Sequence, residues 1–189
     1  MARKKQKQKQ SASHLYASSD SATIVQITPY LYLGPRTATE PRTALAAGIT
    51  HVVSLGCQPV SPRSPALAYH RLGLLDVPGA DLGAPAALAG EIIKKARRDP
   101  DARVLVHCVG GVSRSPAVLA AYLVRKEGLS LREALRLLVS RRPCVRPNDG
   151  FLRQLRDMEA GARGDESMEG VETLPPGVKE KRALLGVEV

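Results

Sequence analysis

The sequence predicts an α/β domain built on a central, mostly parallel sheet of about five strands flanked by helices. Short apolar runs alternate along the chain with longer segments of helical periodicity, as in chains that wind helices around a sheet. The run Val104-Leu-Val106 is apolar at consecutive positions, which is typical of a strand buried on both faces. Aromatic residues make up only 3% of the 189 residues, so Leu, Val and Ala are expected to fill the core.

The predicted strands are short apolar runs bounded by turn residues, and they cover residues 24–28, 30–33, 51–55, 68–75 and 103–107. The predicted helices are bounded by glycine, proline or capping residues, and they cover residues 39–47, 82–98, a segment ending at Gly128, 130–142 and 148–159. Ser130-Leu-Arg-Glu133 is a capping box, and Asn148 is expected to cap the last helix. No internal repeat is present.

The two ends of the chain differ from the middle in composition. The first ten residues carry five basic groups and no acid, and residues 165–189 carry three basic groups against six acids. We therefore expect a disordered basic tail at residues 1–22, a catalytic domain at residues 23–162 and a flexible C-terminal tail at residues 163–189. The basic tail could also be a nuclear address or a contact for nucleic acid.

Composition narrows the class of protein. No run approaches the length of a membrane span, and the start of the chain lacks the apolar stretch of a secretory signal. Three cysteines at irregular spacing argue against a disulfide framework or a zinc site, and predict free thiols in a reducing compartment. The expected location is the cytoplasm, the nucleus or both. The net charge of +10 favours anionic partners without choosing among them.

The stretch Val104-Leu-Val-His-Cys-Val-Gly-Gly-Val-Ser-Arg-Ser-Pro116 places Cys108 between a buried strand and a helix. The N-terminus of a helix favours an anion, so both a thiolate and a bound phosphate would be stabilised there. Cysteines in such positions have pKa values of about 3.5 to 7.5, against about 8.5 for a free thiol. Cys108 is therefore a candidate nucleophile.

The residues after Cys108 suit a small anion. Gly110 and Gly111 allow the loop to curl so that successive N–H groups point inward. The guanidinium of Arg114 can hold two phosphate oxygens at once. The Ser115 hydroxyl could donate to the sulfur and make the thiolate a better leaving group. The predicted phosphate-binding residues are Val109, Gly110, Gly111, Val112, Ser113 and Arg114.

The same Cys-x5-Arg spacing occurs in Cys57-Gln-Pro-Val-Ser-Pro-Arg63. That stretch has two prolines, which remove N–H groups, and no glycine inside the loop. It leads into more loop instead of a helix, so we interpret the second spacing as a coincidence.

The segment HCVGGVSRSP resembles the signature His-Cys-x5-Arg-Ser/Thr of cysteine-dependent protein phosphatases, in its dual-specificity form. From about residue 24 to residue 160 the chain resembles the small atypical dual-specificity phosphatases of the protein tyrosine phosphatase superfamily. The similarity includes Tyr30-Leu-Tyr-Leu-Gly34, Ala121-Tyr-Leu123 and Pro147-Asn-Asp-Gly-Phe151. It implies a protein tyrosine phosphatase-like fold that removes phosphate from phosphotyrosine and from phosphoserine or phosphothreonine.

The resemblance also implies a general acid in the loop about thirty residues before the cysteine. Asp76 stands 32 residues before Cys108 and is the candidate, with Pro78-Gly79 allowing the loop to move. Asp81 lies in the same loop and is the alternative acid, although by similarity it caps the following helix.

Supporting roles follow from the same resemblance. His107 should orient the Cys108 loop through hydrogen bonds, and Asn148 should brace the loop from the last helix. Arg141 and Arg142 match a basic pair that can meet a second phosphate or the substrate backbone, or else they are a solvated helix end. Cys57 and Cys144 are interpreted as structural, but either could form a disulfide with an oxidised Cys108.

The leading hypothesis is a protein phosphatase that needs no cofactor and no metal, with phosphoproteins, among them kinases, as substrates. One alternative keeps the chemistry and changes the substrate to RNA 5′-phosphates or phosphoinositides. A nucleic-acid partner is compatible with the basic charge but is not favoured. Another alternative is an inactive phosphate-binding scaffold. The sequence does not determine the physiological substrate or the oligomeric state.

Overall fold

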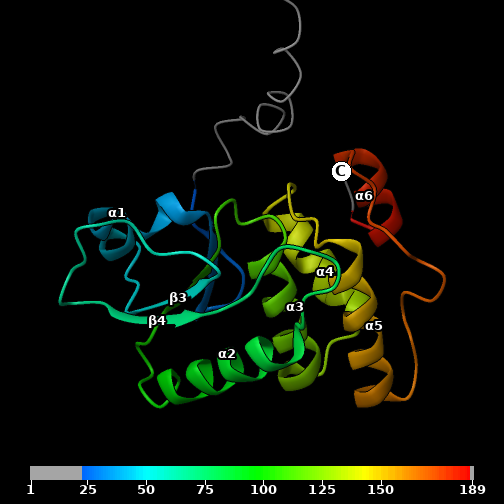
Figure 1. Cartoon of the computed structure of the whole chain (residues 1–189), viewed down its shortest axis with the longest axis horizontal. Coiled ribbons are helices and arrows are strands. Elements are labelled where there is room, and N and C mark those ends of the chain that lie inside the picture. The colour runs from blue at the N-terminus through cyan, green and yellow to red at the C-terminus, as the bar shows by residue number, and fades with distance from the viewer. Residues whose placement is uncertain (1–22, 188–189) are drawn as a thin grey trace, which may run out of the picture.

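A computed structural model describes residues 23–187, and the segment 1–22, which was expected to be a basic tail, lies outside the described residues (Figure 1). The strands of residues 23–187 form one five-stranded sheet in the order β1-β2-β5-β3-β4. The strands are β1 (Val25–Gln26), β2 (Leu31–Gly34), β3 (His51–Leu55), β4 (Ala68–Leu72) and β5 (Val104–His107). β1 pairs with β2 antiparallel and the other pairs are parallel, which confirms the predicted mostly parallel sheet.

The central strands are buried on both faces because their alternate side chains enter two different clusters. Leu33 and Val106 point into the larger cluster, whereas Tyr32 and Leu105 point into the smaller one. This period-two alternation within an apolar run is what a strand covered on both sides requires.

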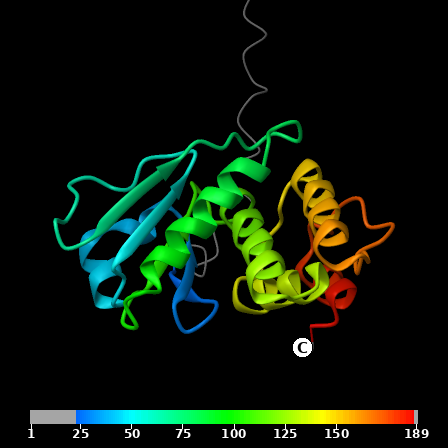
Figure 2. The ribbon, with the colours of Figure 1, turned by 90° about the horizontal axis from the view of Figure 1, so that it is seen from below.

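Helices cover both faces of the sheet, and their bounds are η2 (a 3-10 helix, Arg36–Thr39), α1 (Pro41–Ala46), α2 (Gly83–Ala96), α3 (Arg114–Glu127), α4 (Leu131–Arg141), α5 (Asp149–Arg163) and α6 (Val178–Leu185). η2 and α1 contribute Ala38 and Ala44 to the smaller cluster, on one face. α2 and α3 cover the other face, and α4 and α5 pack on α3 (Figure 2). The carboxyl ends of the parallel strands and the N-terminus of α3 therefore meet at one edge of the sheet.

Several element boundaries differ from the prediction for local reasons. The helix expected at residues 39–47 is α1 and begins two residues later, because Glu40 accepts a hydrogen bond from the Thr43 N–H and starts the helix at Pro41; the short η2 before it was not predicted. Proline at the first helical position loses no hydrogen bond. The strand expected at 68–75 ends at Leu72, and the chain then runs irregularly toward Asp76.

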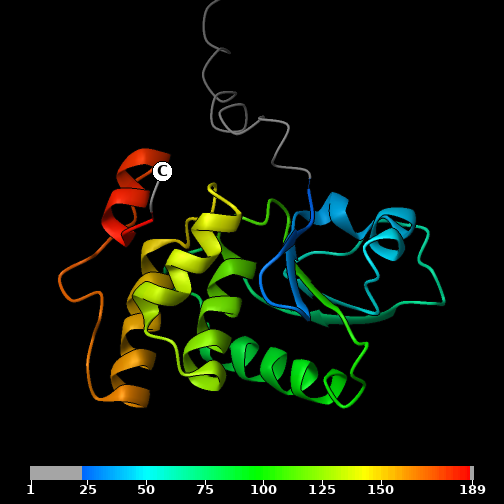
Figure 3. The ribbon, with the colours of Figure 1, turned by 180° about the vertical axis from the view of Figure 1, so that it is seen from behind.

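The C-terminal segment differs from the expectation of a flexible tail at residues 163–189. Met168, Leu174 and Leu185 are buried in the same cluster as the sheet and α3. α6 packs on α4, on the side of the helices away from the sheet (Figure 3). The apolar residues of this segment are too widely spaced to show helical periodicity, so its sequence resembles that of a tail although it is packed.

Candidate active site

Residues 108–114, called the Cys108 loop below, connect the end of β5 to the start of α3. The Cys108 side chain is 2% exposed at the carboxyl edge of the sheet. Its Sγ accepts hydrogen bonds from the Gly111 N–H at 3.2 Å and from the Ser115 hydroxyl at 3.2 Å. Two donors directed at one sulfur stabilise a thiolate, and the Ser115 hydroxyl lies where the sequence analysis placed it.

Four successive carbonyl groups of the Cys108 loop, those of residues 109–112, are held by residues outside the loop. The four hydrogen bonds run from Arg36 N to Val109 O (3.0 Å), Arg142 Nη2 to Gly110 O (2.9 Å), Arg142 Nε to Gly111 O (2.9 Å) and Arg146 N to Val112 O (2.7 Å). In a trans peptide unit the N–H points away from the preceding C=O. The N–H groups of residues 110–113 are therefore turned away from these partners, as a phosphate-binding loop requires.

Gly111 has a positive φ of 65°, and a Cβ at this position would lie 2.7 Å from the Gly34 carbonyl oxygen. Any other residue would have to adopt a left-handed conformation and also displace the end of β2. This glycine is therefore required by both the turn and the close approach of the two loops.

The Arg114 side chain extends from the first turn of α3 toward the end of β3. Its Nη1 donates to the carbonyl oxygens of Leu55 (3.4 Å) and Gly56 (3.3 Å). Its Nε is buried and has no hydrogen-bond partner among residues 23–187. The nearest acceptor, Asp76 Oδ2, lies at ion-pair distance of 3.6 Å and beyond hydrogen-bond reach, so an oxyanion bound in the loop could satisfy this donor.

Asp76 and Arg114 lie side by side although 38 residues separate them in the chain. Asp76 Oδ2 is 3.6 Å from Arg114 Nε, and Asp76 Oδ1 accepts hydrogen bonds from Ser113 Oγ (2.6 Å) and Asn148 Nδ2 (3.0 Å). The irregular segment after β4 thus brings the predicted acid to the edge of the Cys108 loop.

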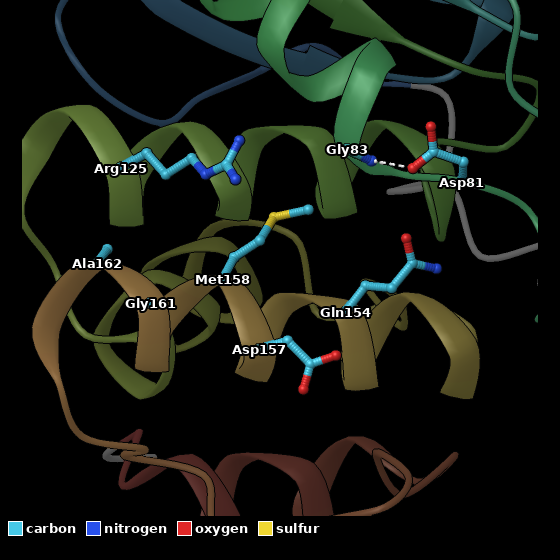
Figure 4. Close-up of a pocket in the computed structure, with 8 residues that line it drawn as sticks. All are labelled: Asp81, Gly83, Arg125, Gln154, Asp157, Met158, Gly161 and Ala162. Atoms are coloured by element: carbon cyan, nitrogen blue, oxygen red, sulfur yellow. Dashed lines mark hydrogen bonds between the residues drawn. The ribbon is translucent and has the colours of Figure 1, made fainter.

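Asp81 has a different role. Its carboxylate accepts hydrogen bonds from the N–H groups of Gly83 (2.8 Å) and Ala84 (3.4 Å) and so caps α2. It borders a groove of about 470 Å³ between α3 and α5, in which Arg125 and Asp157 lie on facing helices (Figure 4). No residue of the Cys108 loop lines this groove.

His107 is fully buried beneath the Cys108 loop. Its Nδ1 lies 3.2 Å from the Cys108 carbonyl oxygen, which can only accept, so Nδ1 carries the proton and Nε2 accepts from Ser54 Oγ at 2.7 Å. Burial is the main cause that lowers the pKa of His107 to about 4; the bond to the Cys108 carbonyl opposes this shift, and the nearby Arg36 adds to it. His107 is therefore a neutral residue that orients the loop.

Asn148 caps α5 as predicted, because its Oδ1 accepts from the Phe151 N–H at 3.0 Å. It also contacts two site residues. Its backbone N–H donates to Ser113 Oγ (3.1 Å), and its side-chain amide donates to Asp76. The contacts of Asn148 thus reach both the Cys108 loop and Asp76.

Arg142 is a site residue whose role the sequence analysis missed. It was expected to meet a second phosphate or to be solvated, but it is 2% exposed and donates to the Gly110 and Gly111 carbonyls. Arg141 is exposed. Pro143 is the one sequence signal for this role, because a proline ends α4 and lets the chain turn back toward the Cys108 loop. The sequence does not show which of the two arginines before it points inward.

The second Cys-x5-Arg spacing forms no comparable loop. Arg63 donates to Gln58 Oε1 and lies over the Tyr69 ring, and no helix follows. Cys57 Sγ lies 3.8 Å from His107 Nδ1, and burial and the nearby Cys108 raise the pKa of its thiol. All three cysteines are free thiols, and a disulfide to an oxidised Cys108 stays a prediction.

Within residues 23–187, no group of three or more His, Cys, Asp or Glu side chains is arranged to hold a metal ion. In the same range, none of the helices is both long enough and apolar enough to cross a membrane.

The site combines a cysteine placed as a nucleophile, a loop of inward N–H groups and an arginine at a helix N-terminus. This combination defines an oxyanion site of the cysteine-dependent phosphatase type. The family model of the dual specificity phosphatase catalytic domain matches residues 31–161. The chain belongs to the dual specificity phosphatase family and is a protein phosphatase.

Curated relatives and solved structures agree with this assignment. The chain is 37% identical to human dual specificity phosphatase 28, over 82% of this chain and 88% of the relative. It is 35% identical to human dual specificity protein phosphatase 14, over 91% of this chain and 88% of the relative.

Among solved structures, human DUSP28 matches with a TM-score of 0.67 and 35% identity, over 73% of this chain and 93% of that one. A mouse putative dual specificity phosphatase complexed with zinc tungstate matches with a TM-score of 0.70 and 33% identity, over 78% and 93% of the two chains.

Proposed function

We propose that this protein phosphatase hydrolyses phosphotyrosine and phosphoserine or phosphothreonine esters through a phosphocysteine intermediate on Cys108. The observation that carries the proposal is the pair of hydrogen bonds to Cys108 Sγ, at the same edge of the sheet as the paired Arg114 and Asp76. In this proposal the Cys108 loop supplies the nucleophile and the oxyanion clamp, and the adjacent segment after β4 supplies the proton donor.

In the first step, the Cys108 thiolate attacks phosphorus, and the S–P bond forms as the bond to the leaving oxygen breaks. The equatorial oxygens are held by the N–H groups of the Cys108 loop and by Arg114, which stabilise the charge of the transition state. The Asp76 carboxyl gives its proton to the leaving alkoxide or phenoxide.

In the second step, water attacks the phosphocysteine, and its proton passes to the Asp76 carboxylate. The S–P bond breaks, releasing inorganic phosphate and the thiolate. The Ser115 hydroxyl, 3.2 Å from Sγ, donates to the sulfur and so stabilises it as a leaving group. No redox chemistry is involved.

Two further observations support this reading. The relative crystallised with zinc tungstate holds a tetrahedral oxyanion that resembles phosphate in shape and charge. In this chain, exposed apolar side chains flank the site: Leu75 (72% exposed), Val77 (47%) and Val109 (56%). Apolar groups beside the phosphate site suit the side chains of a phosphopeptide better than a highly charged inositol headgroup or an RNA 5′ end.

The experiment is a comparison of the wild-type protein with Cys108→Ser on an aryl phosphate and on phosphotyrosine and phosphothreonine peptides, one set taken from kinase activation segments. The wild type should turn over all of them, and Cys108→Ser should lose about 10³-fold or more. Circular dichroism and Tm serve as the folding control.

The same assay distinguishes the other candidates. Faster turnover of 5′-triphosphorylated RNA or inositol lipid than of phosphopeptide would replace the substrate class. Binding of phosphopeptide by the wild type without any turnover would identify a scaffold, and retained hydrolysis by Cys108→Ser would refute the mechanism.

A further inference from the structure

The segment that joins α4 to α5, residues 142–148 and called the connector below, holds the Cys108 loop in place. Arg142 and Arg146 bind three of the four tethered loop carbonyls, and Asn148 N–H binds Ser113. A shift of the connector would therefore rotate the peptide units whose N–H groups face the phosphate. The connector is thus bonded directly to residues 110–113 of the Cys108 loop.

The connector is held in turn by the C-terminal segment. On α6, Lys181 is 1% exposed, and its Nζ donates to the carbonyl oxygens of Pro143 (2.9 Å) and Val145 (2.8 Å). Arg146, whose backbone N–H binds the loop, donates from its Nε to the Leu174 carbonyl at 2.9 Å. The connector thus lies between the Cys108 loop on one side and residues 174–181 on the other.

Lys181 is an unusual group to find at this place. Within the described residues, no carboxylate lies at ion-pair distance from it, so its charge is balanced only by carbonyl dipoles. Burial lowers its pKa, and the neighbouring Arg146 lowers it further. Burying an ammonium without a counter-ion is costly, and a leucine or methionine would fill the same space at lower cost. What the lysine adds is a pair of directed bonds to two connector carbonyls.

We propose that Lys181 is a positioning residue for the active site, which fixes the connector and through it the N–H groups of the Cys108 loop that bind the phosphate. α6 is then a functional part of the phosphatase domain, although it lies beyond the family match at residues 31–161. The proposal rests on the proposed function for the nature of the ligand, an oxyanion.

The test compares Lys181→Met with Lys179→Met, a matched loss of one lysine from an exposed position on the same helix. Affinity for orthovanadate or tungstate, measured without turnover, reports on the loop directly, and kcat and KM for an aryl phosphate are measured beside it. All are taken well below each variant's Tm, so that only folded protein contributes.

We expect Lys181→Met to weaken oxyanion affinity about tenfold, the loss typical of removing a positioned hydrogen-bonding partner of a ligand group, and to lower kcat/KM by a similar factor. Lys179→Met should change neither. If Lys181→Met does not fold, Lys181→Gln is measured instead, because it also removes the buried charge and its amide is too short to reach both carbonyls.

A folded Lys181 variant that has a lower Tm but keeps oxyanion affinity and kcat/KM within twofold would overturn the proposal, since Lys181 would then only stabilise the fold. Failure of the proposed function is a separate result. A wild-type protein that binds vanadate but hydrolyses no phosphoester would refute catalysis, while the comparison of oxyanion affinities would still decide the role of Lys181.

Discussion

Asp76 is held by three groups: the Arg114 guanidinium, the Ser113 hydroxyl and the Asn148 amide. A general acid must lie within reach of the leaving oxygen when the phosphate of the substrate is bound. The three contacts hold the Asp76 carboxyl at the edge of the Cys108 loop, beside the arginine that would bind the phosphate. Asp76 is therefore the acid to test in the proposed mechanism.

Asp76→Asn and Asp81→Asn form a matched pair, because each removes one charge from the same loop. We expect Asp76→Asn to lower the rate about 10²- to 10³-fold for a phosphothreonine peptide and less than about tenfold for an activated aryl phosphate, whose leaving group needs no proton. The alkaline limb of the pH profile should flatten as well.

Asp81→Asn should leave both rates unchanged. The Tm of Asp81→Asn should stay close to that of the wild type, because Asn is itself a good helix cap and α2 should stay folded. Equal losses on both esters from Asp76→Asn would show that Asp76 is not the acid.

The pH dependence of stability tests the neutral state of His107. Its folded-state pKa of about 4 lies below the usual value of 6.5, so the unfolded chain binds a proton first as the pH falls. The contribution of the neutral His107 to the free energy of unfolding is complete above pH 6.5 and is lost as the pH falls from about 6.5 to 4. This histidine alone contributes a slope of at most about 1.4 kcal/mol per pH unit.

Denaturant unfolding of the wild type and His107→Asn at pH 7, 6, 5 and 4.5 measures that slope. The variant should be less stable at pH 7 but lose less stability on acidification. Burial also lowers the pKa values of His51 and His70, so part of the slope remains in the variant. Identical slopes in the two proteins would contradict the neutral, buried assignment.

The sequence predicts the site well where its residues are neighbours in the chain. Cys108, Gly111, Arg114 and Ser115 lie within eight residues, and the strand and helix around them fix their arrangement. Arg142 and Lys181 could not be predicted, because a buried cation bonded to carbonyls has the same sequence signature as a solvated one. Its position depends on tertiary packing that no local pattern encodes.

At the level of single elements, helix starts are predictable when a capping side chain provides the signal. The capping box at Ser130 is present in full: Ser130 Oγ accepts from the Glu133 N–H, and the Glu133 carboxylate accepts from the Ser130 N–H. The start of α1 was predicted two residues too early because its cap is a glutamate, which seldom serves as an N-cap.

Ser130→Ala tests what the capping box contributes to α4, the helix that leads into the connector. We expect the free energy of unfolding to fall by about 0.5 to 2 kcal/mol. The Glu133 N–H loses its acceptor, and the hydrogen bond from the Ser130 hydroxyl to the Glu133 carboxylate is lost as well. The kcat/KM of the folded protein should be unchanged, because the cap lies at the end of α4 away from Arg142.

The matched control is Ser140→Ala in the same helix. Ser140 is exposed and bonds only to the Leu137 carbonyl three residues earlier, so its loss should change stability by less than about 0.5 kcal/mol. A Ser130→Ala effect no larger than this control would mean that the box contributes nothing to α4.

At the scale of the whole molecule, the C-terminal segment completes the hydrophobic core. Its acidic residues pair with arginines of the domain: Arg156 Nη2 lies 3.0 Å from Glu166, and its Nη1 lies 3.2 Å from Glu172. Arg132 donates to the carbonyls of Ser167 (3.0 Å) and Leu184 (2.6 Å). The acidic composition that made this segment resemble a mobile tail is complementary to a basic domain.

If the segment belongs to the domain, it should unfold together with it. Leu185 is 1% exposed at the end of α6, so Leu185→Ala should lower the free energy of unfolding of the whole protein by about 2 to 5 kcal/mol. Val178→Ala, on the exposed side of the same helix, should change it by less than about 0.5 kcal/mol. Urea unfolding followed by far-UV circular dichroism measures both.

The two possible arrangements of the segment give opposite results. In a single cooperative unit, Leu185→Ala lowers the midpoint with an unchanged denaturant slope, because the same surface is exposed on unfolding. If α6 instead detaches on its own, the main transition of Leu185→Ala coincides with that of the wild type. The segment would then be an appendage, and α6 could not hold the connector in place.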